Sequence, residues 1–144
     1  MPDVRFHGAE GKFGFLSNFS ENGFLLEGIH WPTVEHYYQA SKFEDEEFKK
    51  RIICCDTPAL AKRLGGQMAS IRSDWLEIRL DVMQTGVLLK FLQNGEIAKK
   101  LCKIKGNIIE VSKDDSFWGI GPNGSGENKL GQVLMEVRQR LCKQ

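Results

Sequence analysis

The sequence has no long hydrophobic run. No apolar stretch approaches the roughly 20 residues that a membrane-spanning helix needs, and residues 1–20 lack the hydrophobic segment of a secretory signal peptide. An excess of one charge is also missing, because 20 Lys and Arg nearly balance 19 Asp and Glu to give a formal net charge of +1. That balance gives no general electrostatic reason to coat nucleic acid, although it leaves room for a local basic patch. We therefore expect a cytoplasmic protein without a membrane partner.

Metal-binding and redox motifs are missing as well. Of the four cysteines, Cys54 and Cys55 are adjacent while Cys102 and Cys142 stand alone, so the chain contains no CxxC pair. The three histidines show neither HxH nor HExxH spacing. We expect reduced thiols, no metal in the functional site and no cofactor.

The length of 144 residues suits one compact domain, which we expect to span residues 1–144. Hydrophobic residues make up 41% of the chain and charged residues 27%, a composition typical of globular proteins. No internal repeat or low-complexity stretch interrupts the sequence. Residues 4–6 and 24–31 are candidates for short strands around a glycine-punctuated loop at 8–23.

Most of the remaining sequence is predicted to be helical. Apolar periodicity and capping residues indicate helices over 31–43 with a continuation through 44–53, over 58–65, over 73–94, over 96–103 and over 130–141. Gly65 and Gly95 are expected to stop two of them, Phe48 and Ile52 to point inward, and Leu92 to belong to an apolar stripe. A further strand is expected at 107–111. Because strands do not alternate regularly with helices, we predict a compact, helix-dominated α+β domain and not a doubly wound parallel sheet.

Residues 31–43 carry more chemistry than any other segment, with the sequence WPTVEHYYQASKF. Pro32 and Thr33 indicate the start of a helix. Glu35, Gln39 and Lys42 then fall on one stripe of that helix, which has about 3.6 residues per turn. A buried stripe is ordinarily apolar, whereas this one presents an acid, an amide and an amine. The pattern predicts the wall of a polar pocket.

Both charged residues of the stripe also have simpler interpretations. A lysine on a helix is solvated by default, and Glu35 lies in the first turn, where a carboxylate offsets the helix dipole. If Lys42 is partly buried, it is a candidate to bind a phosphate or, with a lowered pKa, to attack a sugar aldehyde as an amine.

A second informative segment is residues 114–131, with the sequence DDSFWGIGPNGSGENKLG. Its glycines, among them Gly119, Gly124 and Gly126, permit close approach of the backbone, and the helix that follows offers free N–H groups. This combination suits a phosphate or another anion. The literal GxGxxG match at 119–124 does not indicate a dinucleotide site, because no βαβ unit follows it. A flexible surface loop is an equally good interpretation.

Asp114 and Asp115 are candidates for a second carboxylate beside Glu35. Two carboxylates facing a sugar carbon are the usual machinery for cleaving a glycosidic bond. An Asp beside a turn also commonly caps that turn, which is the simpler interpretation of Asp114.

Three further residues are candidates for substrate binding. Arg72 precedes the helix predicted at 73–94, and arginine is favoured for bidentate phosphate contacts. Trp75 and Trp118 offer faces on which a base can stack, although tryptophans in a domain of this size are commonly core residues.

The order of these motifs resembles that of the NADAR (YbiA-like) family. The resemblance rests on GFLSNF at 14–19, on the whole of 31–43, on Arg72 with Asp74 and Trp75, on DSFWG at 115–119 and on GSGENKLG at 124–131. It covers nearly the whole chain and implies the small helix-rich α+β fold of that family. The positions that it implies to be functional are Asn18, Glu35, Lys42, Arg72, Trp75, Asp115, Trp118 and Asn128.

The same resemblance implies N-glycosidase activity, the hydrolysis of a C–N bond between a ribose-derived sugar and a base. It implies two substrate classes: phosphoribosylamino-pyrimidine intermediates of riboflavin biosynthesis, and ADP-ribose attached to guanine in nucleic acid. The sequence does not distinguish between the two substrates. The competing hypothesis is a module that binds ADP-ribose or NAD without cleaving it.

In the N-glycosidase hypothesis, Glu35 positions water or stabilises charge at the anomeric carbon. Lys42 lies adjacent or forms a Schiff base with an opened ribose, and Asp115 orients sugar hydroxyls or transfers a proton. Arg72 and the glycine segment hold phosphate, while Trp75 or Trp118 stacks on the base.

Overall fold

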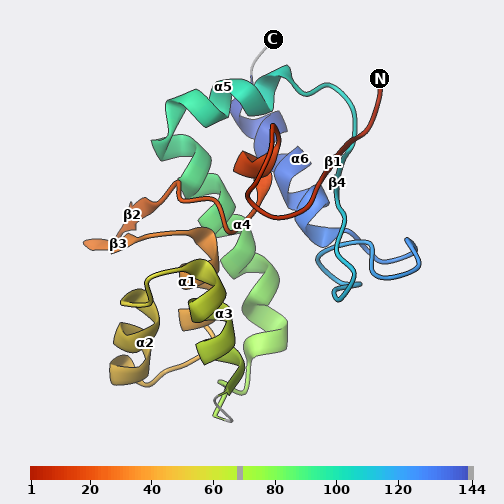
Figure 1. Ribbon diagram of the computed structural model, residues 1–144. Coiled ribbons are helices and arrows are strands. Elements are labelled where there is room, and N and C mark those ends of the chain that lie inside the picture. Colours follow the sequence, from red (N-terminus) through yellow and green to blue (C-terminus); the bar gives the residue numbers. More distant parts are fainter. Residues whose placement is uncertain (68–69, 143–144) are drawn as a thin grey trace.

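The structure, a computed structural model, describes residues 1–67 and 70–142. Residues 68–69 and 143–144 of the expected single domain lie outside the described residues. The elements are β1 (Val4–Phe6), η1 (Gly14–Leu16), β2 (Phe24–Leu26), β3 (Ile29–Trp31), α1 (Val34–Ala40), α2 (Glu46–Ile53), α3 (Pro58–Gln67), α4 (Trp75–Gln93), α5 (Gly95–Lys103), β4 (Ile108–Glu110) and α6 (Lys129–Leu141). Figure 1 shows α4 running through the molecule, with α1, α2 and α3 at one end and α5 and α6 at the other. The predicted helix-dominated α+β fold is confirmed.

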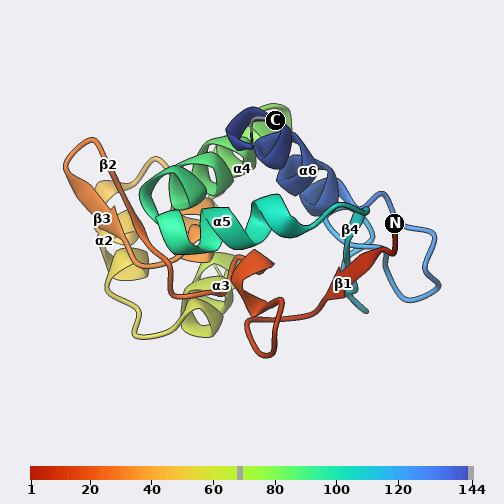
Figure 2. The same cartoon turned by 90° about the horizontal axis from the view of Figure 1, so that it is seen from above.

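The strands form two separate pairs, which Figure 2 shows on opposite sides of α5. β1 pairs with β4 in parallel, with Val4 opposite Ile108. β2 and β3 form an antiparallel hairpin, so the single strand predicted at 24–31 is wrong. The chain reverses at Glu27 and Gly28, whose φ angles of 52° and 80° lie in the left-handed region that a two-residue hairpin turn requires. The sequence does not signal this turn, because Glu is an uncommon residue at its first position.

The helix predicted at 31–53 is two helices. α1 begins after Thr33, whose Oγ1 accepts the N–H of His36 at 3.1 Å. It ends at residue 40, and α2 begins after a second cap, Asp45, which accepts backbone N–H groups. Phe48 and Ile52 of α2 are buried, as the sequence predicts.

The two glycines expected to stop helices differ: α4 ends at Gln93, just before Gly95 as predicted, whereas α3 does not end at Gly65. α3 continues through Gly65, which is buried against Gln39 so closely that a Cβ there would collide with the Gln39 amide. Gly95 is the first residue of α5. The predicted burial of Leu92 is also wrong, because its side chain is 55% exposed.

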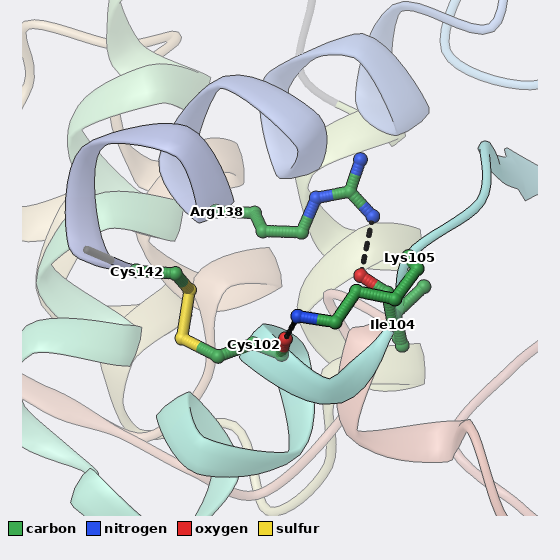
Figure 3. Close-up of a disulfide and its surroundings, with 5 residues drawn as sticks. All are labelled: Cys102, Ile104, Lys105, Arg138 and Cys142. Atoms are coloured by element: carbon green, nitrogen blue, oxygen red, sulfur yellow. Dashed lines mark hydrogen bonds between the residues drawn. A yellow bond between two sulfur atoms is a disulfide. The ribbon is translucent and has the colours of Figure 1, made fainter. Parts of the chain in front are cut away.

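Cys102 and Cys142 form a disulfide between the ends of α5 and α6, so the expectation of reduced thiols is wrong for this pair (Figure 3). Their Cα atoms are 5.5 Å apart. Nearby, Arg138 of α6 donates hydrogen bonds of 2.8 Å to the carbonyl oxygens of Ile104 and Gly106. The disulfide and this arginine fix the segment that leads from α5 into β4. No helix in the described ranges is long and apolar enough to cross a membrane.

Candidate functional site

A cavity of about 530 Å³ lies where α1, α3, α4, β4 and the segment after β4 meet. Most of the residues that line it are polar or aromatic: Ser17, Asn18, Phe19, Glu35, Tyr38, Gln39, Lys42, Lys62, Trp75, Arg79, Met83, Glu110, Ser112, Asp114, Asp115, Phe117 and Trp118. A larger hollow of about 800 Å³ beside α5 contains none of the site residues expected from the sequence. We therefore take the smaller cavity as the candidate site.

The polar stripe of α1 lines this cavity. Glu35 is only 7% exposed, and the Gln39 amide donates a 2.6 Å hydrogen bond to its Oε2 atom. The Gln39 Oε1 atom has no hydrogen-bond partner among the described residues. Gln39 therefore braces Glu35 from the next helical turn.

Burial shifts the protonation of both charged residues of the stripe. It raises the pKa of Glu35, against the opposing effects of the Gln39 hydrogen bond and of the Lys62 and Lys42 charges. It lowers the pKa of Lys42, and the Glu35 charge opposes that shift. An acid and an amine that are both displaced toward their neutral forms in one cavity are suited to proton transfer.

Aromatic side chains form another part of the wall. Tyr38 lies between Trp75 and Trp118, with ring centroids 5.0 Å and 5.6 Å away. The Trp118 indole N–H donates a 3.0 Å hydrogen bond to the Tyr38 hydroxyl oxygen. Burial raises the pKa of Tyr38 to about 12, so the hydroxyl stays protonated at neutral pH. Both tryptophans line the cavity, where the sequence analysis expected one of them to meet a base.

Asp115 lines the cavity and also caps a turn. Its Oδ1 atom accepts the backbone N–H groups of Phe117 at 2.9 Å and Trp118 at 2.8 Å. The capping role that the sequence suggested for Asp114 therefore belongs to Asp115. Asp114 lines the cavity too.

The arginine in the cavity is Arg79 and not Arg72. Arg72 is held by two hydrogen bonds to Asp74, at 2.6 Å and 3.2 Å, and does not line the cavity. Arg79 stacks on the ring of Phe117, with its guanidinium carbon 3.7 Å from the ring centroid. The sequence held a signal for it, because Arg79 follows Trp75 by four residues and so shares a helix face with it.

The glycine segment, for which an anion site was predicted, packs against the start of α6. Gly119, Gly124 and Gly126 do not line the cavity. The N–H groups at the start of α6 are already used: those of Asn128, Lys129 and Leu130 donate to the carbonyl oxygens of residues 119, 117 and 118 at 2.9–3.1 Å. Because these donors face the chain itself, the helix start has little left to offer a phosphate.

Asn128, a predicted substrate-binding residue, has a structural role and does not line the cavity. Its Oδ1 atom accepts the N–H of Glu110, and its Nδ2 atom donates to the Ile108 carbonyl oxygen, both at 2.9 Å. Asn128 adopts a left-handed φ of 53°, which asparagine tolerates well. It therefore links the start of α6 to β4.

Asn18 lies at the cavity, as expected. Its Nδ2 atom is 3.4 Å from the Met83 sulfur, and its buried Oδ1 atom has no partner among the residues that the structure describes. A buried acceptor without a hydrogen-bond partner costs free energy unless a bound molecule donates to it. Asn18 is therefore a candidate to bind substrate.

Besides Arg79, two more charged cavity residues were not predicted from the sequence, Lys62 and Glu110. Lys62 of α3 is 6.0 Å from the ring centroid of Phe19. Glu110, the last residue of β4, is partly buried, and burial raises its pKa to about 7. A charged residue at the end of a three-residue strand gives no periodic signal, so the sequence offered no means to find Glu110. Within residues 1–67 and 70–142, no cluster of His, Cys, Asp and Glu has the arrangement of a metal site.

Comparison with known proteins identifies close counterparts. The family model of the NADAR domain matches residues 5–142. The N-glycosidase YbiA of Escherichia coli strain K12 is 34% identical over 96% of this chain and 88% of its own length. An N-glycosidase of Nostoc punctiforme is 38% identical over 96% of this chain and 92% of its own. A riboflavin biosynthesis protein of Vibrio vulnificus is 39% identical over 96% of this chain but only 38% of its own length. The NMR structure of E. coli YbiA is similar with a TM-score of 0.88 and 33% identity, covering 96% of this chain and 84% of that chain.

Proposed function

The chain belongs to the NADAR domain family, and on this premise we propose that it is an N-glycosidase that hydrolyses the C–N bond between a phosphorylated ribose and a nitrogenous base. Relatives named N-glycosidase support the reaction. A relative named as a riboflavin biosynthesis protein supports a phosphoribosylamino-pyrimidine intermediate as the substrate. The structural observation that carries the proposal is the buried Glu35, braced by Gln39 beside Lys42 in a polar cavity.

Glu35 acts at the anomeric carbon. The Gln39 amide donates a hydrogen bond to the Oε2 atom of Glu35. The other carboxylate oxygen of Glu35 is left to accept a proton from water. Because burial raises its pKa, Glu35 is a stronger base than an exposed glutamate. The water oxygen bonds to the anomeric carbon while the C–N bond breaks, and the bonding electrons leave with the base nitrogen, which takes up a proton. The net change is the addition of one water molecule.

The cations of the cavity bind the phosphate. Arg79 and Lys62 take the role first expected of Arg72 and the glycine segment, because both line the cavity. Arg79 is held in place by its stacking on Phe117, and arginine is well suited to phosphate oxygens. The cavity wall around Tyr38 then receives the base, and Asn18 accepts a hydrogen bond from the substrate.

Lys42 has two roles that experiment separates. As a cation it stabilises a substrate oxygen or phosphate. As a neutral amine, favoured by the lowered pKa, it forms a Schiff base with an opened ribose. Borohydride treatment during turnover traps a covalent adduct only in the second case, and a Lys42→Met variant then gives no adduct.

The function is tested by incubating the protein with the phosphoribosylamino-pyrimidine and, separately, with ADP-ribosylated guanine in DNA, and by measuring released base. We expect release from the first substrate. Glu35→Gln is expected to lower kcat by about 10²–10⁴-fold, the usual contribution of a positioned base. The matched control is Glu77→Gln, which changes an exposed glutamate of α4 and leaves kcat unchanged.

Other outcomes contradict parts of this proposal. Full turnover by Glu35→Gln removes Glu35 from the reaction. Release only from the DNA substrate assigns the ADP-ribosyl class to the cavity. No release from either substrate, together with measurable ADP-ribose binding, favours the non-catalytic module.

A further inference from the structure

Glu110 lies at the end of β4, far along the chain from the α1 stripe, and brings a further carboxyl group to the cavity. It lines the same cavity as Glu35 and Asp115. No hydrogen bond to its side chain is formed by any residue in the described part of the chain. The Glu110 carboxyl group is therefore free to act on a bound molecule.

The backbone beneath this side chain is held on three sides. The Glu110 N–H donates to Asn128 Oδ1 at 2.9 Å, and the Glu110 carbonyl oxygen accepts the N–H of Ile120 at 3.0 Å. Glu110 also pairs with Phe6 in the parallel ladder of β1 and β4. A free side chain on a fixed backbone is the arrangement that a catalytic group requires.

The surroundings of Glu110 favour its protonated form. Burial raises its pKa to about 7, the negative charges of Asp115 and Glu35 add to the shift, and the charge of Lys62 opposes it. The other charged groups that line the cavity are Lys42 just after α1, Arg79 of α4 and Asp114. Glu110 can therefore hold a proton at neutral pH and release it during the reaction.

Asp115 is less suited to this task. Its Oδ1 atom already accepts two backbone N–H groups, at 2.9 Å and 2.8 Å. These contacts tie Asp115 to the turn at residues 115–118 and leave less of its carboxyl group free to meet a substrate.

We propose that Glu110 is the general acid of the reaction, a role that rests on the N-glycosidase function proposed above. The Glu110 carboxyl group gives its proton to the leaving nitrogen as the C–N bond breaks and its electrons pass to that nitrogen. Glu35 takes a proton from the attacking water as the new C–O bond forms. Glu110 is reprotonated from solvent and Glu35 releases its proton to solvent, so the net reaction consumes one water. Two carboxyl groups with separate acid and base roles are the common arrangement in glycoside hydrolysis.

The test compares the pH dependence of kcat in the wild-type protein, Glu110→Gln and Asp115→Asn. The wild-type kcat is expected to fall as the pH rises above about 7, because Glu110 loses its proton. Glu110→Gln is expected to lower kcat by about 10²–10⁴-fold and to abolish this alkaline decrease. Asp115→Asn retains a side-chain oxygen that can cap the turn and is expected to keep the decrease. Loss of the decrease in Asp115→Asn, with its survival in Glu110→Gln, overturns the proposal.

A second readout separates acid catalysis from a structural effect. In 4-nitrophenyl ribofuranoside 5-phosphate the leaving group departs as a stable anion and needs no proton. The loss caused by Glu110→Gln is expected to shrink to less than about tenfold with this probe. Equal losses on the probe and on the natural substrate overturn the proposed role. Glu110→Asp, which keeps a carboxyl group, is expected to retain the alkaline decrease at a lower rate.

The two proposals fail in different ways. If the wild-type protein releases no base from either natural substrate, the N-glycosidase function is wrong and the acid role falls with it. If the wild-type protein releases base while Glu110→Gln matches its rate and pH profile, only the role of Glu110 is wrong.

Discussion

Lys90 is the most unusual buried residue outside the cavity. Its side chain is 1% exposed, and its Nζ atom donates a 2.9 Å hydrogen bond to the Ser17 carbonyl oxygen. No carboxylate within the described ranges forms a salt bridge with it, and burial lowers its pKa to about 7. Because Ser17 precedes Asn18 and Phe19 of the cavity, Lys90 anchors one edge of the site from α4.

This anchor predicts a pH dependence of stability. The folded-state pKa of Lys90, about 7, lies below the unfolded value of about 10.4. Between these values the unfolded chain binds more protons, so the free energy of unfolding rises with pH, by up to about 1.4 kcal/mol per unit. Lys90→Met removes this contribution. Urea unfolding from pH 6.5 to 9.5 should show the wild type gaining stability relative to the variant as the pH rises; a constant difference would contradict the assignment.

At the scale of single residues, the sequence predicted those positions that follow from helical geometry. Glu35 lines the cavity from α1, where the helix period fixes which side chains share a face, and Lys42 lines it from the turn just after the end of that helix. The same reasoning could have predicted Arg79, which shares a helix face with Trp75. It could not have predicted Glu110, since only the pairing of β1 with β4 brings it to the site. The pairing of Arg72 with Asp74 depends on local backbone geometry that residue types do not specify.

At the scale of elements, the contact between α6 and β4 depends on one side chain. Asn128→Ala removes both hydrogen bonds to β4 and places alanine in a left-handed conformation. We expect a loss of stability of about 2–4 kcal/mol, from the unpaired backbone groups and the strained φ. We also expect a lower kcat, because Glu110 loses its support.

The alternative for Asn128 is direct contact with substrate, and it predicts a different result. A binding role raises KM and leaves the melting temperature near its wild-type value. Asn128→Asp is the matched variant, because it keeps the acceptor for the Glu110 N–H and loses only the donor to Ile108. Its stability should lie between those of the wild type and Asn128→Ala.

Element boundaries were predicted less well than element types. Caps decided the boundaries: Asp45 begins a new helix where apolar periodicity predicted continuation. Gly65 stays inside α3 because Gln39 needs the space that a side chain would fill. Contacts of this kind join α1 to α3 and are invisible in the sequence of either helix alone.

At the scale of the whole molecule, the disulfide should contribute to stability and not to catalysis. The bond joins cysteines separated by 40 residues, which corresponds to about 4 kcal/mol in the chain-entropy account. Neither cysteine lines the cavity. Cys102→Ser, or reduction of the wild type, should therefore lower the melting temperature and leave kcat unchanged at temperatures where the variant is folded.

The control for this prediction is Cys54→Ser, because Cys54 is exposed and free. It should melt like the wild type in both oxidising and reducing buffer. A melting temperature of the wild type that does not respond to reduction would show that the Cys102–Cys142 bond adds nothing. The sequence could not reveal this pair, because no local spacing connects cysteines so far apart along the chain.

The pairing of β1 with β4 also sets the order in which the site can be assembled. The α1 stripe lies within one short segment and its helix contacts are local, whereas Val4 meets Ile108 only after most of the chain has been synthesised. Closing so long a loop is slow compared with forming a helix, because its entropy is lost before any contact compensates for it. A nascent chain therefore contains Glu35 well before Glu110 can join it in the same cavity. We therefore expect activity to return late in refolding, together with closure of the parallel strand pair.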